Sequence, residues 1–204
     1  ILDTSIFSIT IPSEVRIIGK KAFSDCEYLR QIEFSNESKL EIIEEKAFNN
    51  ASIEIITIPD KTRIIGKNAF CNCQRLQRIE FSNESKLEII EEEAFNNTSI
   101  ESITIPSKVK DLKEGWCKGA DELRIVKVNQ SNQQYCCFEE GIIIGKETVD
   151  SSDYVNLVFC DRNIKSLTIL DSIKRFYSYS FYRTSITNIK IPKEVRTIGK
   201  CAFG

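Results

Sequence analysis

The sequence predicts an α/β solenoid, a stack of similar coils with a parallel sheet on its concave face and short helices or turns on its convex face. Residues 33–59 recur as residues 80–106, and only three of the 27 positions differ. The Ile-Pro pairs at 11–12, 58–59 and 105–106 keep the same offset of 47. The first four Ala-Phe pairs are spaced 25, 22 and 25 residues apart, so each 47-residue repeat contains two units of about 23 residues.

Each unit begins with a short strand. Its apolar residues take the first, fourth and sixth positions, as in Leu29, Ile32 and Phe34, and the last three positions alternate with the two-residue period of a strand. A short helix is expected where the unit ends in Ala-Phe, as in residues 18–23. A unit of about 23 residues cannot bury its own apolar face, so it must stack on its neighbours.

The repeat is regular over residues 1–128, where Trp116-Cys117 takes an Ala-Phe position. Residues 129–163 lose the rhythm, and we expect hairpin-like strands there that continue the sheet. Residues 164–204 resume the pattern, with a strand at 164–169 and Ser180-Phe181 in an Ala-Phe position. The chain has no Met and ends in mid-repeat, so we interpret residues 1–204 as one solenoid that is a fragment of a longer array.

Composition argues against several functions. The chain has 28 Lys+Arg, 30 Asp+Glu and no His, for a net charge of −2. This balance disfavours nucleic-acid binding through phosphate neutralisation, and no apolar run approaches the roughly 20 residues of a membrane span. Without His the chain lacks the commonest general base and metal ligand. We therefore expect no enzyme, no catalytic residue, no cofactor and no direct membrane insertion.

The eight cysteines do not predict a metal site. Cys26 and Cys73 share one repeat position and are expected to be buried thiols. Cys71 and Cys73 form the only Cys-x-Cys spacing, which falls short of the roughly four ligands that zinc needs. Whether the cysteines in the irregular stretch are thiols or disulfides stays open; they are Cys136, Cys137 and Cys160.

The repeat has a recognisable residue pattern. One copy consists of Ile9, Ile11, Pro12, Val15, Ile18, Gly19, Ala22, Phe23, Cys26, Leu29 and Ile32. This pattern resembles the BspA-like leucine-rich repeats, and the Asn-, Ser-, Lys- and Glu-rich composition is similar to that of versions from protist parasites. The resemblance implies a curved leucine-rich-repeat solenoid without catalysis. It also implies a surface protein that adheres to host matrix, host cells or other microbes.

We therefore expect a cell-surface or secreted adhesion and recognition module that binds protein. The alternative is an intracellular scaffold or structural subunit of a large cytoplasmic assembly. The family supplies no fixed binding residues, so candidates come from geometry. The third and fifth strand positions point away from the core, and neighbouring strands lie about 4.8 Å apart. They form two columns, which are Ser8, Gln31, Ile55, Arg78, Ser102 and Ile125, and Thr10, Glu33, Thr57, Glu80, Thr104 and Lys127.

Two loop asparagines are candidate glycosylation sites. Asn36 and Asn83 lie in Asn-x-Ser sequences at equivalent repeat positions. In a secreted eukaryotic protein they would be glycan acceptors. They are equally compatible with ordinary turn residues copied by duplication.

Overall fold

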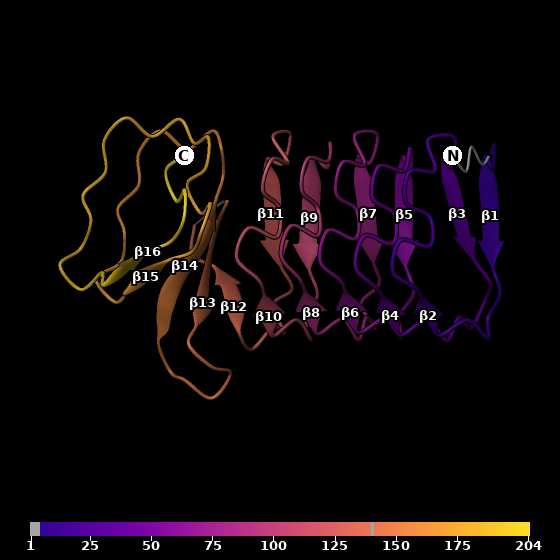
Figure 1. Cartoon of the computed structure of the whole chain (residues 1–204). Helices are drawn as coiled ribbons and strands as arrows, with labels where there is room; N and C mark the ends of the chain where they lie inside the picture. Colours follow the sequence, from indigo (N-terminus) through magenta and orange to yellow (C-terminus); the bar gives the residue numbers. More distant parts are fainter. Residues whose placement is uncertain (1–4, 140) are drawn as a thin grey trace.

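The coils stack along one axis, and each regular coil contributes one long and one short strand (Figure 1). The computed structural model describes residues 5–139 and 141–204. Six four-residue strands lie side by side, all parallel where they pair: β1 (Ser8–Ile11), β3 (Gln31–Phe34), β5 (Ile55–Ile58), β7 (Arg78–Phe81), β9 (Ser102–Ile105) and β11 (Ile125–Val128).

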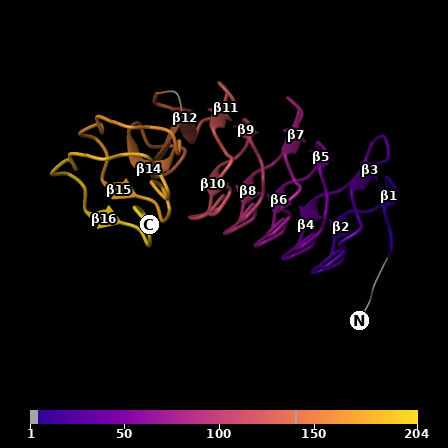
Figure 2. The ribbon, with the colours of Figure 1, turned by 90° about the horizontal axis from the view of Figure 1, so that it is seen from above.

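The short strands form a second, uninterrupted parallel sheet. They are β2 (Ile17–Ile18), β4 (Ile42–Ile43), β6 (Ile64–Ile65), β8 (Ile89–Ile90) and β10 (Asp111–Leu112). Seen from above, the two sheets run along opposite sides of the stack (Figure 2). The solenoid therefore has a long-strand face and a short-strand face.

The long-strand sheet opens at two places. No ladder joins β3 to β5 in the described part of the chain, and β7 pairs with β9 only at Arg78 and Ser102. After β3 and β11 the first residue extends the ladder: the Ser35 N–H donates to the Ile11 oxygen at 3.0 Å, and the Asn129 N–H donates to the Ile105 oxygen at 2.9 Å. Pro59 and Pro106 take that position after β5 and β9 and have no N–H to donate. Each proline therefore removes a possible ladder donor beside one of the two openings.

The expected helices are wrong. Within residues 5–139 and 141–204 no helix is present, and the segments around the Ala-Phe pairs are ladders of stacked turns. The Phe23 and Asp25 N–H groups donate to the Ala47 and Asn49 oxygens of the next coil, both at 2.7 Å, while the intervening Ser24 N–H turns back to the Lys21 oxygen at 3.1 Å. Alternate N–H groups thus bind the neighbouring coil.

Backbone dihedrals explain why no helix forms. Lys21 and Asp25 have φ values of 58° and 62°, and Lys46 and Asn50 repeat them at 58° and 60° in the next coil. A right-handed helix requires φ near −60° throughout, so a positive value every fourth residue excludes it. The cost of these conformations is offset by hydrogen bonds between coils.

Aromatic side chains stack through the interior. The rings of Phe23, Phe48, Phe70 and Phe95 follow one another with centroids 5.3, 5.2 and 5.7 Å apart. Trp116 closes the stack edge-on, 6.2 Å from Phe95. Cys26 and Cys73 are buried among the apolar side chains, which confirms that part of the sequence prediction.

Three antiparallel strands follow the regular coils. They are β12 (Tyr135–Cys137), β13 (Ile142–Lys146) and β14 (Tyr154–Cys160). β14 then pairs in parallel with β15 (Arg175–Phe176), and β15 pairs with β16 (Thr197–Ile198). The expected hairpin-like strands are present, but the expectation that they continue the sheet is wrong, because they belong to a separate five-stranded sheet.

The expected strand at residues 164–169 is wrong, because the structure assigns no strand there. β12 and β13 lie against β11 and separate residues 164–169 from the long strands (Figure 1). Those residues therefore have no neighbouring long strand with which to pair. Ser180-Phe181 does occupy a buried Ala-Phe position, and Phe181 stacks on Phe203 of the last coil at 4.7 Å.

The antiparallel strands divide two apolar cores. Ile143 and Phe159 pack with the regular coils, whereas Ile142, Ile144 and Leu157 pack with the last coils. Because successive strand residues point to opposite faces, one sheet serves both cores. This explains why β13 and β14 are buried on both faces.

Candidate functional site

The two predicted columns lie on the outside of the long-strand sheet. Eleven of the twelve residues are exposed and Glu80 is half-buried, while the residues between them point inward. Ladder register places Ile55, Arg78, Ser102 and Ile125 in line. The other ladder pairs in the columns are Ser8 with Gln31, Thr10 with Glu33, Thr57 with Glu80, and Thr104 with Lys127.

The columns are not continuous. No ladder pairs Gln31 with Ile55 or Glu33 with Thr57 among the described strands, because the sheet opens between β3 and β5. The Glu80 ladder likewise ends before Thr104. Exposure of alternate residues thus follows the sequence pattern, and each opening lies beside a strand that is followed by proline.

Each opening is a hollow on the long-strand face. We call the one between β3 and β5 groove 1 and the one between β7 and β9 groove 2; their volumes are about 610 and 480 Å³. Seven lining residues of groove 1 recur in groove 2 at the 47-residue offset. The pairs are Ile32/Ile79, Glu33/Glu80, Phe34/Phe81, Ser35/Ser82, Asn36/Asn83, Thr57/Thr104 and Pro59/Pro106.

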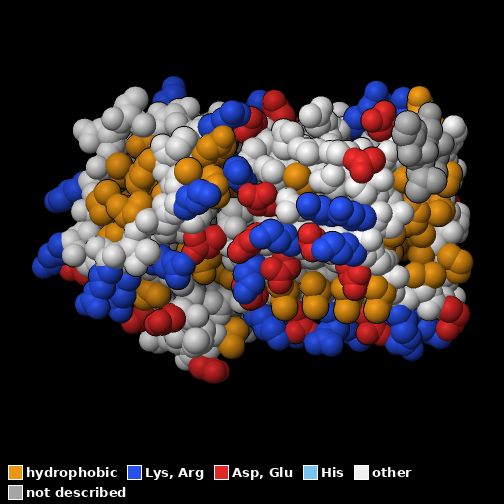
Figure 3. Space-filling model, in the orientation of Figure 1, with side chains coloured by type: hydrophobic (Ala, Val, Ile, Leu, Met, Phe, Trp, Pro, Cys, Tyr) orange, Lys and Arg blue, Asp and Glu red, His pale blue; other side chains and the backbone are white. Residues whose placement is uncertain are grey.

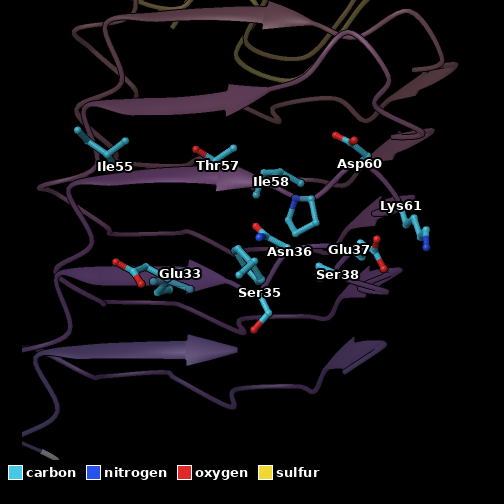
Figure 4. Close-up of a pocket in the computed structure, with 13 residues that line it drawn as sticks. Glu33, Ser35, Asn36, Glu37, Ser38, Ile55, Thr57, Ile58, Asp60 and Lys61 are labelled. Carbon is cyan, nitrogen blue, oxygen red and sulfur yellow. The ribbon is translucent and has the colours of Figure 1, made fainter. Parts of the chain in front are cut away.

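Groove 1 has a strand part and a loop part (Figure 4). Glu33 and Thr57 project from β3 and β5, while Asn36, Asp60 and Lys61 lie on the loops beyond the strand ends. The recurring Ile-Pro pairs are the sequence signal for these grooves. The repeat pattern alone did not predict the effect of these prolines on the neighbouring ladder.

Asn36 and Asn83 are exposed and line equivalent parts of the two grooves. Their side chains are accessible to solvent. A glycan on either would stand at the end of a groove, so glycosylation and ligand binding at these positions would compete. Modification of either residue stays a prediction.

The short-strand face carries a feature that the sequence reasoning missed. Ile17, Ile42, Ile64 and Ile89 lie in ladder register and form an apolar row between rows of charge (Figure 3). Ion pairs link successive coils beside the row, including Lys20–Glu45 at 2.6 Å and Lys67–Glu92 at 2.7 Å. Applying the same register argument to the short strands would have found it.

The buried thiols are chemically quiet. Burial raises the pKa of Cys73, Cys117 and Cys160 to about 12 each. Cys73 also donates to the Phe48 oxygen at 3.0 Å. Such thiols are not nucleophiles near neutral pH. All eight cysteines, including Cys136, Cys137 and Cys160, are free thiols.

No metal centre is found in the part of the chain that the structure describes, because no three His, Cys, Asp or Glu side chains are grouped to hold an ion. The described residues also contain no helix long and apolar enough to cross a membrane.

A buried arginine lies at the boundary between the two cores. Arg162 is 7% exposed, and its guanidinium lies over the rings of Phe159 and Tyr182, 4.9 and 5.9 Å from their centroids. Arginine is rarely buried this deeply, so residue type alone does not predict its position. Its cation–π contacts join β14 to the last coils.

Comparison with known proteins places these observations in a family. The sequence profile described as "BspA type Leucine rich repeat region" matches in six copies, over residues 2–124 and 131–204. No curated protein sequence shows significant similarity to the chain.

Solved structures with the same fold include three bacterial proteins. The pneumococcal vaccine antigen PcpA is 31% identical with a TM-score of 0.88, over 97% of this chain and 48% of its own. A leucine-rich cell surface protein from Faecalibacterium prausnitzii is 20% identical with a TM-score of 0.74, over 97% and 57%. A leucine-rich repeat protein from Eubacterium ventriosum is 18% identical with a TM-score of 0.72, over 98% and 59%. The chain thus spans about half the length of these structures.

Proposed function

Because the chain belongs to the BspA-type leucine-rich-repeat family, we propose that it is a recognition module of a cell-surface protein and binds a protein partner without catalysis. The binding surface is the long-strand face. One observation carries the proposal: on this face Ile55, Arg78, Ser102 and Ile125 form an exposed row in ladder register, and Ile55 and Ile125 are 48% and 53% exposed. Exposed apolar side chains among polar ones, on a rigid sheet, suit a protein interface.

Placement at the cell surface is supported by relatives. One structural relative is named as a cell surface protein, and another, 31% identical to this chain, is named as a vaccine antigen. Labelling intact source cells with a membrane-impermeant amine reagent would test it. We expect the protein to be labelled as strongly on intact as on lysed cells; labelling only after lysis would contradict the proposal.

The binding face is tested with two matched double variants. Ile55→Glu with Ile125→Glu alters the long-strand face, and Lys20→Glu with Lys67→Glu alters exposed residues of the short-strand side. Binding to immobilised extracellular-matrix proteins and to intact cells is measured for each. We expect the first variant to bind at least tenfold more weakly and the second to match the parent. Equal binding by both variants, or no binding by the parent, would sink the proposal.

An intracellular scaffold is the alternative, and the eight free thiols favour it. A reducing compartment keeps thiols in this state without further assumption. Glycan on Asn36 or Asn83 of the native protein would exclude the alternative. Titration of all eight thiols as free in denatured native-source protein would favour it over the surface proposal.

A further inference from the structure

The two grooves are copies of one scaffold that differ in how their glutamate is neutralised. In groove 2 Arg78 and Glu80 form an ion pair with 2.9 Å between Nε and Oε1, and Thr57 Oγ1 donates to Glu80 Oε2 at 3.0 Å. Arg78 lies two residues before Glu80 on the same strand, so both side chains project from the same face. Groove 2 therefore contains its own cation.

Groove 1 lacks this cation. Gln31 occupies on β3 the position that Arg78 occupies on β7, and it does not line the groove. The Glu33 carboxylate is exposed and makes none of the ion pairs or hydrogen bonds found for Glu80. Lys61 also lines groove 1, but it lies beyond the strand ends, away from Glu33 (Figure 4). Glu33 is thus free to pair with a cation from outside.

A second difference makes groove 1 more apolar. Ile55 lines it and is 48% exposed, whereas Ser102 takes the equivalent place in groove 2. The rings of Phe34 and Pro59, which have counterparts in groove 2, complete the apolar wall beside Ile55. An alkyl stem that ends in a positive charge can lie along such a wall while its head pairs with a carboxylate.

We propose that groove 1 is the docking site for an arginine or lysine side chain of a protein partner, flanked in that partner by an apolar residue that packs on Ile55. The partner's cation takes the place beside Glu33 that Arg78 takes beside Glu80. This inference rests on the proposed function, because it names the partner chemistry of the same face. Groove 2, already neutralised from within, does not bind.

The test uses peptide probes and amide NMR. The ¹⁵N-labelled chain is titrated with acetyl-Gly-Leu-Arg-Gly-amide, and separately with the same peptide carrying citrulline, which keeps the shape of the side chain but is uncharged and has a carbonyl oxygen in place of one NH2 group. We expect the arginine peptide to shift the amides of Glu33, Ile55 and Thr57, and the citrulline peptide to bind at least fivefold more weakly. Raised salt should weaken binding of the arginine peptide, because the ion pair between its arginine and Glu33 is exposed to solvent.

Swapping the neutralising residue gives the sharper test. Gln31→Arg supplies groove 1 with an internal cation and should abolish the shifts, although the protein folds because the repeat already accepts Arg at position 78. Arg78→Gln should create new peptide-dependent shifts at Glu80 and Thr104. Thermal unfolding of both variants checks the fold.

Two results would overturn the inference: equal binding of the arginine and citrulline peptides, or unchanged binding by Gln31→Arg. Either result leaves the binding-face experiment to stand or fall separately, since that experiment depends on Ile125 as well and needs no cation. If instead the double variant Ile55→Glu with Ile125→Glu keeps full partner binding while the peptide shifts occur as expected, the proposed function fails and the groove chemistry stands.

Discussion

At the scale of single residues, burial controls the thiols. Cys73, Cys117 and Cys160 have their pKa raised to about 12, because a thiolate in an apolar interior loses its hydration. In the unfolded chain a Cys has a pKa of about 8.5. Each thiol therefore stabilises the fold fully below pH 8.5, and this contribution is lost as the pH rises toward 12.

We expect the free energy of unfolding to fall between pH 8 and pH 10 through these thiols. Urea titrations at pH 7, 9 and 10 would measure it, with Cys73→Ala as the comparison. The variant should be less stable at pH 7 because a buried contact is removed, but its stability should fall less steeply with pH. Parallel slopes for parent and variant would show that Cys73 does not titrate on unfolding.

Residue patterns predicted exposure well and the grooves poorly. The two-residue period of a strand was enough to place Ile55 and Ile125 outside and Ile56 and Val126 inside. Predicting the grooves requires one further inference: Pro59 has no N–H, so a hydrogen bond to the neighbouring strand is missing. The difference between Gln31 and Arg78 becomes informative only when the two grooves are compared.

At the scale of elements, the turn ladder replaces the expected helix. Lys21, Lys46, Asn68 and Glu93 share one repeat position with φ between 55° and 58°. Lysine and glutamate are good helix formers and give no sign of a left-handed conformation. Only Gly, Asn and Asp commonly mark a positive φ, so the two charged types concealed it.

A glycine substitution distinguishes a turn from a helix, because the free energy of unfolding should rise for the turn and would fall for the helix. Lys46→Gly relieves a left-handed conformation that costs roughly 1–2 kcal/mol and adds freedom to the unfolded chain worth about 0.4–1 kcal/mol. We expect a net gain in unfolding free energy of about 0.5–1 kcal/mol, measured by urea denaturation. In a helix the same change would destabilise by about 1 kcal/mol relative to alanine. The control Lys46→Ala should leave the turn unchanged, whereas it would stabilise a helix.

The prolines give a second prediction at this scale. Pro59→Ser supplies the N–H that Ser35 uses one coil earlier, so β5 should form a hydrogen bond to β3 there and groove 1 should narrow. We expect the residue 59 amide to be protected from hydrogen exchange and the arginine peptide to bind more weakly.

Pro12→Ser is the matched control. Pro12 follows β1, which has no described strand on its other side, so the new amide has no acceptor and should exchange quickly. Fast exchange at residue 59 in Pro59→Ser would mean that something other than the missing donor separates the strands.

At the scale of the whole molecule, the chain is a one-dimensional stack of coils with three antiparallel strands, β12, β13 and β14, inside it. In such stacks stability is close to a sum of coil and neighbour terms. The antiparallel strands interrupt it, but polar contacts still cross the interruption: the Ser178 N–H donates to Glu114 Oε2 at 3.0 Å, and Arg175 and Arg183 pair with Glu114 and Asp121. Lys118 also lies over the Tyr179 ring at 5.0 Å.

The irregular stretch, residues 129–163, shows which structural features the sequence pattern predicts and which it does not. Its strands were expected from runs such as residues 141–145, but a run buried on both faces looks the same whether it faces one core or two. Only the structure shows that Ile143 faces the regular coils while Ile142 and Ile144 face the last coils. The sequence could not give this, because it depends on which coils flank the sheet.

Substitutions of two adjacent isoleucines therefore test whether the antiparallel strands separate the two cores. Ile143→Ala and Ile144→Ala remove the same atoms from sites 0% and 4% exposed, at a cost of about 2–5 kcal/mol each. If each strand face supports its own core, the loss should be directional. Hydrogen exchange should rise in residues 89–112 for Ile143→Ala and in residues 169–202 for Ile144→Ala, with the other region closer to the parent. Both variants loosening both regions alike would mean that the two cores unfold as one, and that the sheet couples them rather than divides them.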